Sequence, residues 1–477
     1  MRPLLGDRAQ PSPEGSLRLP RQLNPLRPEV DMQIVYFTER PYRGIEEREI
    51  LRNRAFFGTS NRLFDHIKGS RLYNYYFDEM LYAEALGFDG IALNEHHGTP
   101  FCMGGVMNLE AAILARITTT AKIVLIGNAL PSKNPLRMAE ELATIDLISE
   151  GRLISGWVRG SGSEQFFNNI NPALNREMFE EAHDIIVQAW SRPGPWRYEG
   201  KHYHFRMVNP WTLPYQKPHP PMWIPGLLSP ETIAWAAERA YPYVGLGTAL
   251  SMTCDMYDMY ADVAAKFGYQ AGSENFGYLV PVVVADTEEQ AQEVGAGFVW
   301  GGGGGAFSRP EHTLPAGYNS KTAIRRLATQ PGGTWLGVSR DRLREQLTDS
   351  RATSEVDEAA IKARLQSGYL KQQANYQLVV GTPDSVLPKI RTILEVLRPG
   401  ALIMFAVQGG EVSDADRMRS LQLTGEVVLP EVRTIASELG LADGSERAPG
   451  SVKLRPGDSR HAVVDRERLA AAEIPQS

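Results

Sequence analysis

The sequence predicts an α/β fold, a (β/α)8 TIM barrel with insertions. Short β-branched runs alternate with longer amphipathic runs along most of the 477 residues, and the alternation repeats eight times. Eight is the number of strand–helix steps that closes a parallel sheet into a barrel. Prolines and charged residues concentrate at both ends, outside this alternation. We therefore expect a Pro-rich extension (residues 1–30), a barrel (31–440) and a polar tail (441–477) that lies outside the core.

The expected strands share a short length and a high content of β-branched or aromatic residues. In chain order they are Gln33–Phe37, Gly90–Leu93, Ile123–Ile126, Leu153–Val158, Met222–Ile224, Tyr243–Leu246, Tyr278–Val284 and Leu402–Val407. Each is followed by a segment with helical spacing of its apolar residues. These segments are Tyr73–Leu86, Leu109–Thr118, Leu136–Ile148, Glu177–Trp190, Glu231–Ala240, Asp255–Phe267, a Glu- and Gln-rich run after Val284, and Ala415–Leu429, with Asp384–Leu397 as an additional helix before the last strand.

Local start and stop signals support these helices. Asn134 followed by Pro135 is an N-cap with proline at the first helical position, and Ser229 followed by Pro230 repeats the pattern. Asn175 is expected to cap the helix before Trp190. The run Ser149-Glu150-Gly151 ends one helix before the next strand begins.

Two insertions interrupt the alternation. Residues 196–208 alternate around Gly200 and predict a β-hairpin. A longer excursion, residues 300–376, opens with five glycines, Gly301 to Gly305. No Lys-Ser or Lys-Thr pair follows these glycines, so they predict a flexible hinge or lid and not a phosphate loop.

Composition excludes several classes of protein. The net charge of −6 comes from interspersed charges with no basic stripe, which argues against nucleic acid as a partner. The two cysteines, Cys102 and Cys254, are too few for a disulfide framework. No signal peptide is evident, and no apolar run approaches the roughly 20 residues of a membrane span. We expect a soluble, cytoplasmic protein without membrane contact.

The most informative segment is Asn94-Glu95-His96-His97, directly after an expected strand. Histidines beside a carboxylate at a barrel mouth indicate proton transfer, metal ligation or cofactor contact. Adjacent strand residues point to opposite faces, so His96 and His97 cannot readily hold one metal ion, and we expect no metal. We expect His96 to carry chemistry, with Glu95 and His97 as its support, although both could be purely structural.

Further segments at strand ends have the composition of an anion site. Arg159 and Gly160 begin a Gly-rich loop, where a guanidinium and accessible N–H groups can meet an anion. Arg176 falls in the first turn of a helix, an unfavourable place for a cation without a bound anion, unless it pairs with a nearby glutamate. The remaining candidates are Gly226, Ser229 and Thr232 at another helix start, and Asn128-Ala129, where small residues would let a flat group approach the backbone.

In this order, the segments resemble those of the bacterial luciferase-like family of flavin-dependent oxidoreductases. The resemblance includes Asn94 to His97, Asn134 to Glu141, Ser149 to Leu153, Arg159-Gly160, Tyr198 to Tyr203, Pro218 to Pro221, Ser229 to Thr232, Gly381 to Pro383 and Val428 to Pro430. It implies a TIM barrel that takes reduced FMN (FMNH2) from a separate flavin reductase and uses a flavin peroxide to oxygenate a small organic substrate. The resemblance further implies a homodimer.

Residue roles follow from the same resemblance. His96 matches the family's catalytic histidine, Asn128-Ala129 falls where a non-proline cis peptide often contacts the flavin, and Arg159, Arg176, Ser229 and Thr232 would hold its phosphate. Val158 stands where the luciferase catalytic chain has a reactive cysteine, so light emission is not implied. Alternatives are hydride transfer with the deazaflavin F420, a non-catalytic flavin-binding subunit and, least favoured, a metal-dependent hydrolase.

Overall fold

The computed structural model describes the core of the chain, the first insertion in full and part of the second. The described residues are 32–46, 49, 59–160, 162–227, 229–297, 320–322, 358–408, 412–444, 452–455 and 457–472. The expected N-terminal extension, the five-glycine run and the hinge or lid predicted from it lie outside these residues. Within the second insertion the structure describes the helix α14 (Glu358–Ala374).

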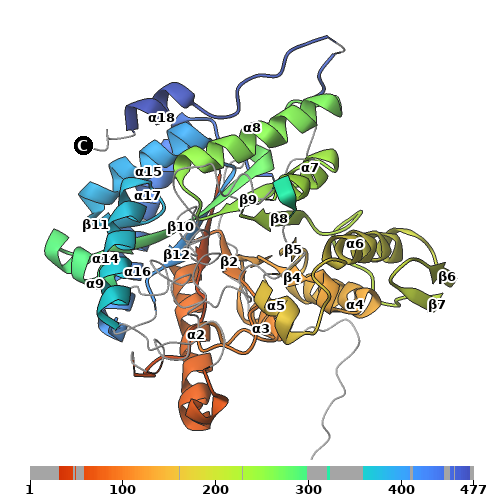
Figure 1. The fold of residues 1–477 in the computed structure, drawn as a ribbon, viewed down its shortest axis with the longest axis horizontal. Helices are drawn as coiled ribbons and strands as arrows, with labels where there is room; N and C mark the ends of the chain where they lie inside the picture. The colour runs from red at the N-terminus through yellow and green to blue at the C-terminus, as the bar shows by residue number, and fades with distance from the viewer. Residues whose placement is uncertain are drawn as a thin grey trace, which may run out of the picture.

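The eight expected strands form a closed parallel barrel (Figure 1). In order around the barrel they are β1 (Gln33–Phe37), β2 (Gly90–Leu93), β3 (Lys122–Leu125), β5 (Leu153–Val158), β8 (Met222–Gly226), β9 (Tyr243–Leu246), β10 (Phe276–Val284) and β12 (Ala401–Ala406). The pairing of β12 with β1, in the register Gln33 to Ala401, closes the ring. The predicted fold class is confirmed.

Helices surround the barrel on its outer side (Figure 1). They are α2 (His66–Ala85), α3 (Met107–Ile117), α4 (Pro135–Ser149), α6 (Asn175–Ser191), α7 (Pro230–Glu238), α8 (Leu250–Lys266), α9 (Glu288–Gly297), α15 (Pro383–Leu397), α16 (Asp414–Leu423) and α17 (Leu429–Glu438). The short helix α5 (Gly162–Phe167) lies in the segment after β5. The segment 196–208 forms the expected antiparallel hairpin, β6 (Trp196–Glu199) and β7 (His204–Val208), which projects beyond α4 and α6 in Figure 1.

Side-chain alternation along the strands divides the core into two layers. In β1, Val35 and Phe37 belong to the cluster inside the barrel, whereas Ile34 and Tyr36 belong to the cluster under the helices. All four are at most 1% exposed. Burial of both faces explains why the strands are continuous apolar runs without polar alternation.

Two glycines permit a close backbone approach between β3 and β5. A Cβ on Gly156 would lie 1.7 Å from the carbonyl oxygen of Leu125, and one on Gly127 would lie 2.5 Å from the oxygen of Gly156. The Ile126–Gly127 peptide is cis. The cis bond expected at Asn128–Ala129 is therefore misplaced, since the observed one lies after β3 and before β4 (Asn128–Ala129), two strands that both run parallel to β5.

The structure adds two short strands that the sequence reading omits. β4 pairs with β5, and β11 (Val379–Gly381) pairs with the carboxyl-terminal end of β10. One edge of β10 is occupied by β12, so β11 follows β9 along the other edge. Each is too short to show a strand pattern in the sequence.

Several helix boundaries also differ from expectation. Asn134 caps α4 as predicted, by accepting from the N–H of Arg137. Asn175 and Ser229 do not cap their helices through their side chains. The last helix does not end at Leu429, because a π-helical turn (Thr424–Val428) connects α16 to α17.

The polar tail was expected to lie outside the core, and for its described part this is wrong. Val463, Val464 and Leu469 are 5–6% exposed and belong to the cluster beneath the helices. The N–H of Asp465 donates to the oxygen of Val396 on α15. The short helix α18 (Arg466–Ala472) then lies beside α15. Few but well-spaced apolar residues anchor the tail despite its high charge. In the described part of the chain, no helix is long and apolar enough to cross a membrane.

Candidate functional site

The predicted site residues lie at the carboxyl-terminal ends of barrel strands, in the segments that follow these strands, or in the first turns of the next helices. Glu95, His96 and His97 follow β2; Asn128 and Ala129 form β4; Arg159 and Gly160 follow β5; Arg176 is in the first turn of α6; Gly226 ends β8; Ser229 and Thr232 lie at the start of α7. In a parallel barrel these ends share one face of the molecule. The candidates therefore converge on the end where barrel enzymes place their active sites.

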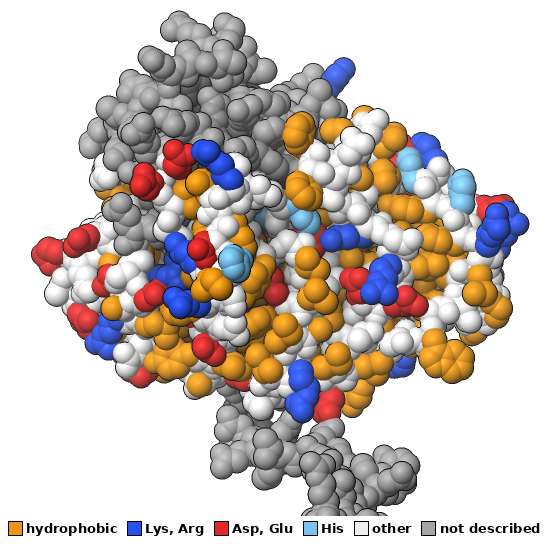
Figure 2. Space-filling model, turned by 90° about the horizontal axis from the view of Figure 1, so that it is seen from below, with side chains coloured by type: hydrophobic (Ala, Val, Ile, Leu, Met, Phe, Trp, Pro, Cys, Tyr) orange, Lys and Arg blue, Asp and Glu red, His pale blue; other side chains and the backbone are white. Residues whose placement is uncertain are grey.

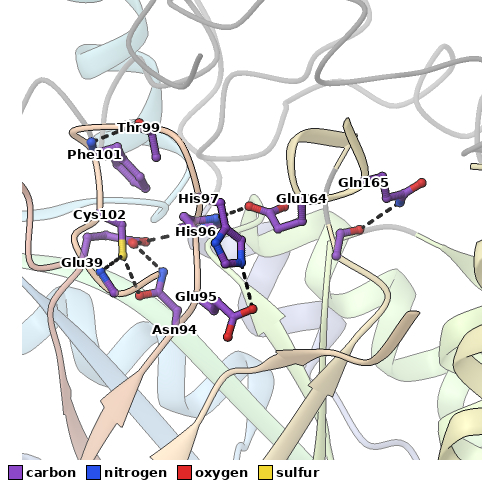
Figure 3. A network of polar contacts seen from close by, with 12 residues as sticks. Glu39, Asn94, Glu95, His96, His97, Thr99, Phe101, Cys102, Glu164 and Gln165 are labelled. Carbon is purple, nitrogen blue, oxygen red and sulfur yellow. Dashed lines mark hydrogen bonds and ion pairs between the residues drawn. The ribbon is translucent and has the colours of Figure 1, made fainter. Parts of the chain in front are cut away.

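His96 is held in a polar cluster (Figure 3). Its Nδ1 lies 2.8 Å from Oε1 of Glu164 on α5, and its Nε2 lies 3.8 Å from Oε2 of Glu39, two residues beyond β1. The His96 ring also packs 5.7 Å from the ring of Phe101. The His96 side chain is 22% exposed, whereas the two carboxylates are 1–4% exposed. An imidazole at the barrel mouth thus lies over two buried acids.

A buried chain of polar contacts fixes Glu39. The amide of Asn94 donates to its carboxylate, and the Glu39 N–H donates to Gln408, which follows β12, over 2.8 Å. Beyond Asn94, the guanidinium of Arg40 donates to the Asn94 carbonyl oxygen at 2.7 Å and pairs with Glu110 of α3 at 2.7 Å. Each of these side chains is buried. The position of Glu39 is therefore determined by the protein interior.

The surroundings shift the acid–base properties of this cluster. Burial lowers the pKa of His96, but the carboxylates of Glu164 and Glu39 together have the larger, opposite effect and raise it to about 9. Burial raises the pKa of Glu39, against the opposing effects of His96, Asn94 and Arg40. The arrangement favours a protonated His96 at neutral pH, able to donate a proton.

Glu95 and His97 form a separate pair beside His96. Nε2 of His97 lies 3.0 Å from Oε1 of Glu95, and Nζ of Lys133 lies 2.7 Å from the same oxygen. The His97 ring stacks on Phe167 of α5, with ring centres 4.9 Å apart. The support expected for His96 is thus provided by Glu164 and Glu39, while Glu95 is occupied by His97 and Lys133.

A second cluster brings together three of the predicted anion-binding residues. Nη2 of Arg176 donates to Oγ of Ser229 at 2.8 Å and to Oγ1 of Thr232 at 3.4 Å. Glu180 and Glu231 lie 3.9 and 3.8 Å from the same guanidinium. Arg176 therefore lies near two glutamates, as the alternative interpretation expected for one, and also contacts the start of α7.

Arg159 joins this cluster through Asn175. Its Nη1 lies 3.3 Å from Oδ1 of Asn175, whose Nδ2 donates to the Arg159 carbonyl oxygen at 2.7 Å. This double contact explains why Asn175 does not cap α6. It also ties Arg159 to the first turn of α6, which carries Arg176.

Small residues connect the two clusters. A Cβ on Gly160 would lie 3.3 Å from Cβ of Ala129 and 3.2 Å from Cβ of Glu164, the partner of His96. Asn128 is 0% exposed, and both its side-chain Oδ1 and Nδ2 lack a hydrogen-bond partner. A buried amide without partners is costly, and such a group commonly marks a ligand site. At β8, a Cβ on Gly226 would lie 2.5 Å from the Tyr243 hydroxyl oxygen.

Glu39 and Glu164, whose carboxylates face His96, were not among the candidates predicted from the sequence. Functional residues of barrel enzymes usually follow the carboxyl-terminal ends of the strands, and this strand-end rule was the reason to select His96. It also applies to Glu39 and Gln408, which follow barrel strands at the same end. Glu164 lies in a helix of six residues with no strand-end signal. Among the described residues, no group of three or more His, Cys, Asp or Glu side chains could hold a metal ion.

Comparison with known proteins identifies the family. The family model described as luciferase-like monooxygenase matches residues 59–397. An uncharacterised protein, y4wF of Sinorhizobium fredii, is 30% identical over 256 residues, which cover 52% of this chain and 73% of that protein.

Two characterised relatives match over about half their own length. The alkanal monooxygenase alpha chain of Photobacterium leiognathi is 30% identical, with 39% of this chain and 52% of the relative covered. The oxygenase component of a flavin-dependent trigonelline monooxygenase of Acinetobacter baylyi is 26% identical, with 36% and 48% covered.

Solved structures share the fold at low sequence identity. The monooxygenase RslO1 of Streptomyces bottropensis has a TM-score of 0.59 at 18% identity, covering 84% of this chain and 99% of that one. The oxygenating constituent of the Pseudomonas putida 3,6-diketocamphane monooxygenase, in complex with FMN, has a TM-score of 0.57 at 17% identity, covering 84% and 98%. An F420-dependent secondary alcohol dehydrogenase has 0.54 at 14%, covering 84% and 99%. From the family match over most of its length, the chain belongs to the luciferase-like monooxygenase family.

Proposed function

We propose that the protein is the oxygenase component of a two-component monooxygenase that uses reduced FMN and O2. The observation that carries this proposal is that three polar groups occupy the same end of the barrel. They are His96 with its two buried carboxylates, the Arg176 guanidinium at the start of α7, and the buried side-chain amide of Asn128, which has no hydrogen-bond partner. The first is suited to proton donation, the second to a phosphate, and the third to a polar ring edge.

The residues present fit FMN. Arg176, Ser229 and Thr232 offer a guanidinium and two hydroxyls beside the N-terminus of α7, a combination suited to a phosphomonoester. Arg159 adds a second guanidinium through Asn175. Asn128 can donate to and accept from the isoalloxazine edge.

Bound reduced FMN would supply two electrons, so that one atom of O2 enters the substrate and the other leaves as water. The chain's own contribution is to bind, orient and protect. His96 holds a proton at the barrel mouth, with Glu164 fixing its ring through Nδ1. Phe101 and Trp223 are at most 1% exposed and cover the barrel interior beneath it, which keeps water away. Glu95 and His97 shape the adjacent loop.

The proposal includes a separate flavin reductase and a second copy of the chain. The trigonelline relative is itself named as an oxygenase component. For the homodimer, the support is an apolar stripe on α3: Leu109, Ile113 and Ile117 are 65, 44 and 40% exposed at helical spacing. Figure 2 shows the molecule from the side on which α2 and α3 lie at the bottom of Figure 1, and hydrophobic side chains gather there.

Anaerobic binding of the two candidate cofactors tests the proposal. We expect the protein to bind reduced FMN, to bind reduced F420 weakly or not at all, and to consume O2 once reduced FMN is bound. Tight binding of reduced F420 with anaerobic hydride transfer to an acceptor would replace the proposal with the deazaflavin alternative. Binding of FMN in both redox states without O2 consumption would indicate a non-catalytic subunit.

A further inference from the structure

Both ring nitrogens of His96 face carboxylates that come from different elements of the barrel. Glu164 on α5 lies 2.8 Å from Nδ1, and Glu39, after β1, lies 3.8 Å from Nε2. Figure 3 shows the imidazole between these two acids. The first distance is that of a hydrogen bond, and the second is that of an electrostatic contact.

This geometry distinguishes between the two protonation states of the ring. A neutral imidazole has one N–H and one nitrogen lone pair, so one of the two carboxylates would face a lone pair. A protonated imidazole presents an N–H to each acid. With both carboxylates ionised, the arrangement of Glu39, His96 and Glu164 is thus electrostatically consistent only when the ring carries its second proton.

Glu39 and the residues that hydrogen-bond to it are buried away from solvent. Glu39 is 1% exposed, its carboxylate accepts from the Asn94 amide, and its N–H donates to Gln408. Asn94 is in turn held by Arg40, which forms a buried ion pair with Glu110. These buried contacts hold the Glu39 carboxylate in place independently of the solvent-exposed residues at the barrel mouth.

We propose that Glu39 is a positioning residue that, together with Glu164, keeps His96 protonated and oriented as a proton donor. This inference rests on the proposed function only in one respect, the use of the His96 proton in the monooxygenase reaction. Among the described residues, the charged groups that act on His96 include Glu164, Glu39 and, with the opposite effect, Arg40. Glu95 pairs with His97 and Lys133 on the same loop.

The test is an NMR titration of the cofactor-free protein with labelled histidine. The His96 resonance is assigned by its loss in His96→Gln. In the wild type we expect a midpoint of about 9. Glu39→Gln keeps an oxygen for the Asn94 amide but removes the charge, and the midpoint should fall by about one to three units. Glu39→Asp keeps the charge and should retain most of the elevation.

Glu84→Gln is the matched control, because Glu84 accepts from the N–H groups of Thr119, Thr120 and Ala121 and not from His96. It should leave the His96 midpoint unchanged. An identical midpoint in Glu39→Gln and the wild type would overturn the proposal, as would equal falls in Glu39→Gln and Glu39→Asp. If neither variant folds, a wild-type midpoint at or below the ordinary histidine range still refutes it. Because no flavin is present, these outcomes are separate from failure of the proposed function.

Discussion

Replacing Arg176 with alanine should weaken binding of reduced FMN while leaving binding of reduced riboflavin nearly unchanged. Riboflavin lacks the phosphate, so the two ligands differ only at the group that Arg176 is proposed to contact. The Arg176 guanidinium lies 2.8 Å from Ser229 at the start of α7 and is 28% exposed. These values place it where a phosphate would be only partly shielded from water.

The structure sets the expected magnitude. A hydrogen bond to a charged group contributes about 1.5–3 kcal/mol. Glu180 and Glu231, at 3.9 and 3.8 Å, already neutralise part of the Arg176 charge in the free protein. The loss should therefore lie near the lower limit, about 1.5 kcal/mol, which is roughly a tenfold higher Kd.

The assay is anaerobic calorimetry or fluorescence titration with both reduced ligands. Arg137→Ala provides the control, since Arg137 is also near a helix start but is 71% exposed and pairs with Glu141. It should alter neither Kd. Arg159→Ala should behave like Arg176→Ala. Equal weakening of FMN and riboflavin would show a general structural defect, and unchanged FMN affinity would refute the phosphate role.

Three further predictions concern the site, the core and the tail. His96→Ala should slow turnover by about 100-fold or more with little change in FMN affinity, measured by oxygen uptake and by anaerobic titration; lost FMN binding would instead assign His96 to packing. His183 is buried among Trp157, Trp235 and Tyr241, and burial lowers its pKa. The neutral form is favoured by folding, so its contribution to stability is complete above about pH 6.5 and declines as the pH falls. Urea unfolding across pH should show His183→Gln with a flatter acid limb than the wild type, and an unchanged limb would contradict this reading. Leu469→Ala should cost about 2–3 kcal/mol of unfolding free energy. Arg466→Gln should cost under about 1 kcal/mol, because the Arg466 side chain, which pairs with Asp255 and Asp258, is 45% exposed. A negligible effect of Leu469→Ala would contradict the burial of the tail against the core.

The barrel could be predicted because its evidence is local. Each strand is a continuous apolar run, and helix starts such as Asn134-Pro135 carry their own signals. β11 could not be predicted, because three residues show no periodicity and their pairing with β10 joins distant parts of the chain. The tail was misjudged because its composition is polar, although Leu469 and two valines are enough to anchor it.

The site was predictable only where the strand-end rule applied. His96 and the Arg176 cluster follow from residue type and position, and the structure joins Arg176 to Ser229 and Thr232 as their shared barrel end suggests. The partners of His96 were not predictable in this way. Glu164 lies 68 residues away from His96 on a six-residue helix, and adjacency in sequence favoured Glu95 instead. Spatial contact between distant loops decides such pairings, and a single sequence does not encode it in local pattern.

The origin of the oxygen atom in the product shows whether the protein is an oxygenase that uses O2. The protein, a flavin reductase, NADH and FMN are incubated under ¹⁸O₂ with an aliphatic aldehyde, a cyclic ketone and an N-methylpyridinium carboxylate, and products are analysed by mass spectrometry. We expect one ¹⁸O atom in the product of an accepted substrate, and none when FMN is omitted. Product oxygen derived from water, or substrate oxidation without any O2 consumption, would contradict it.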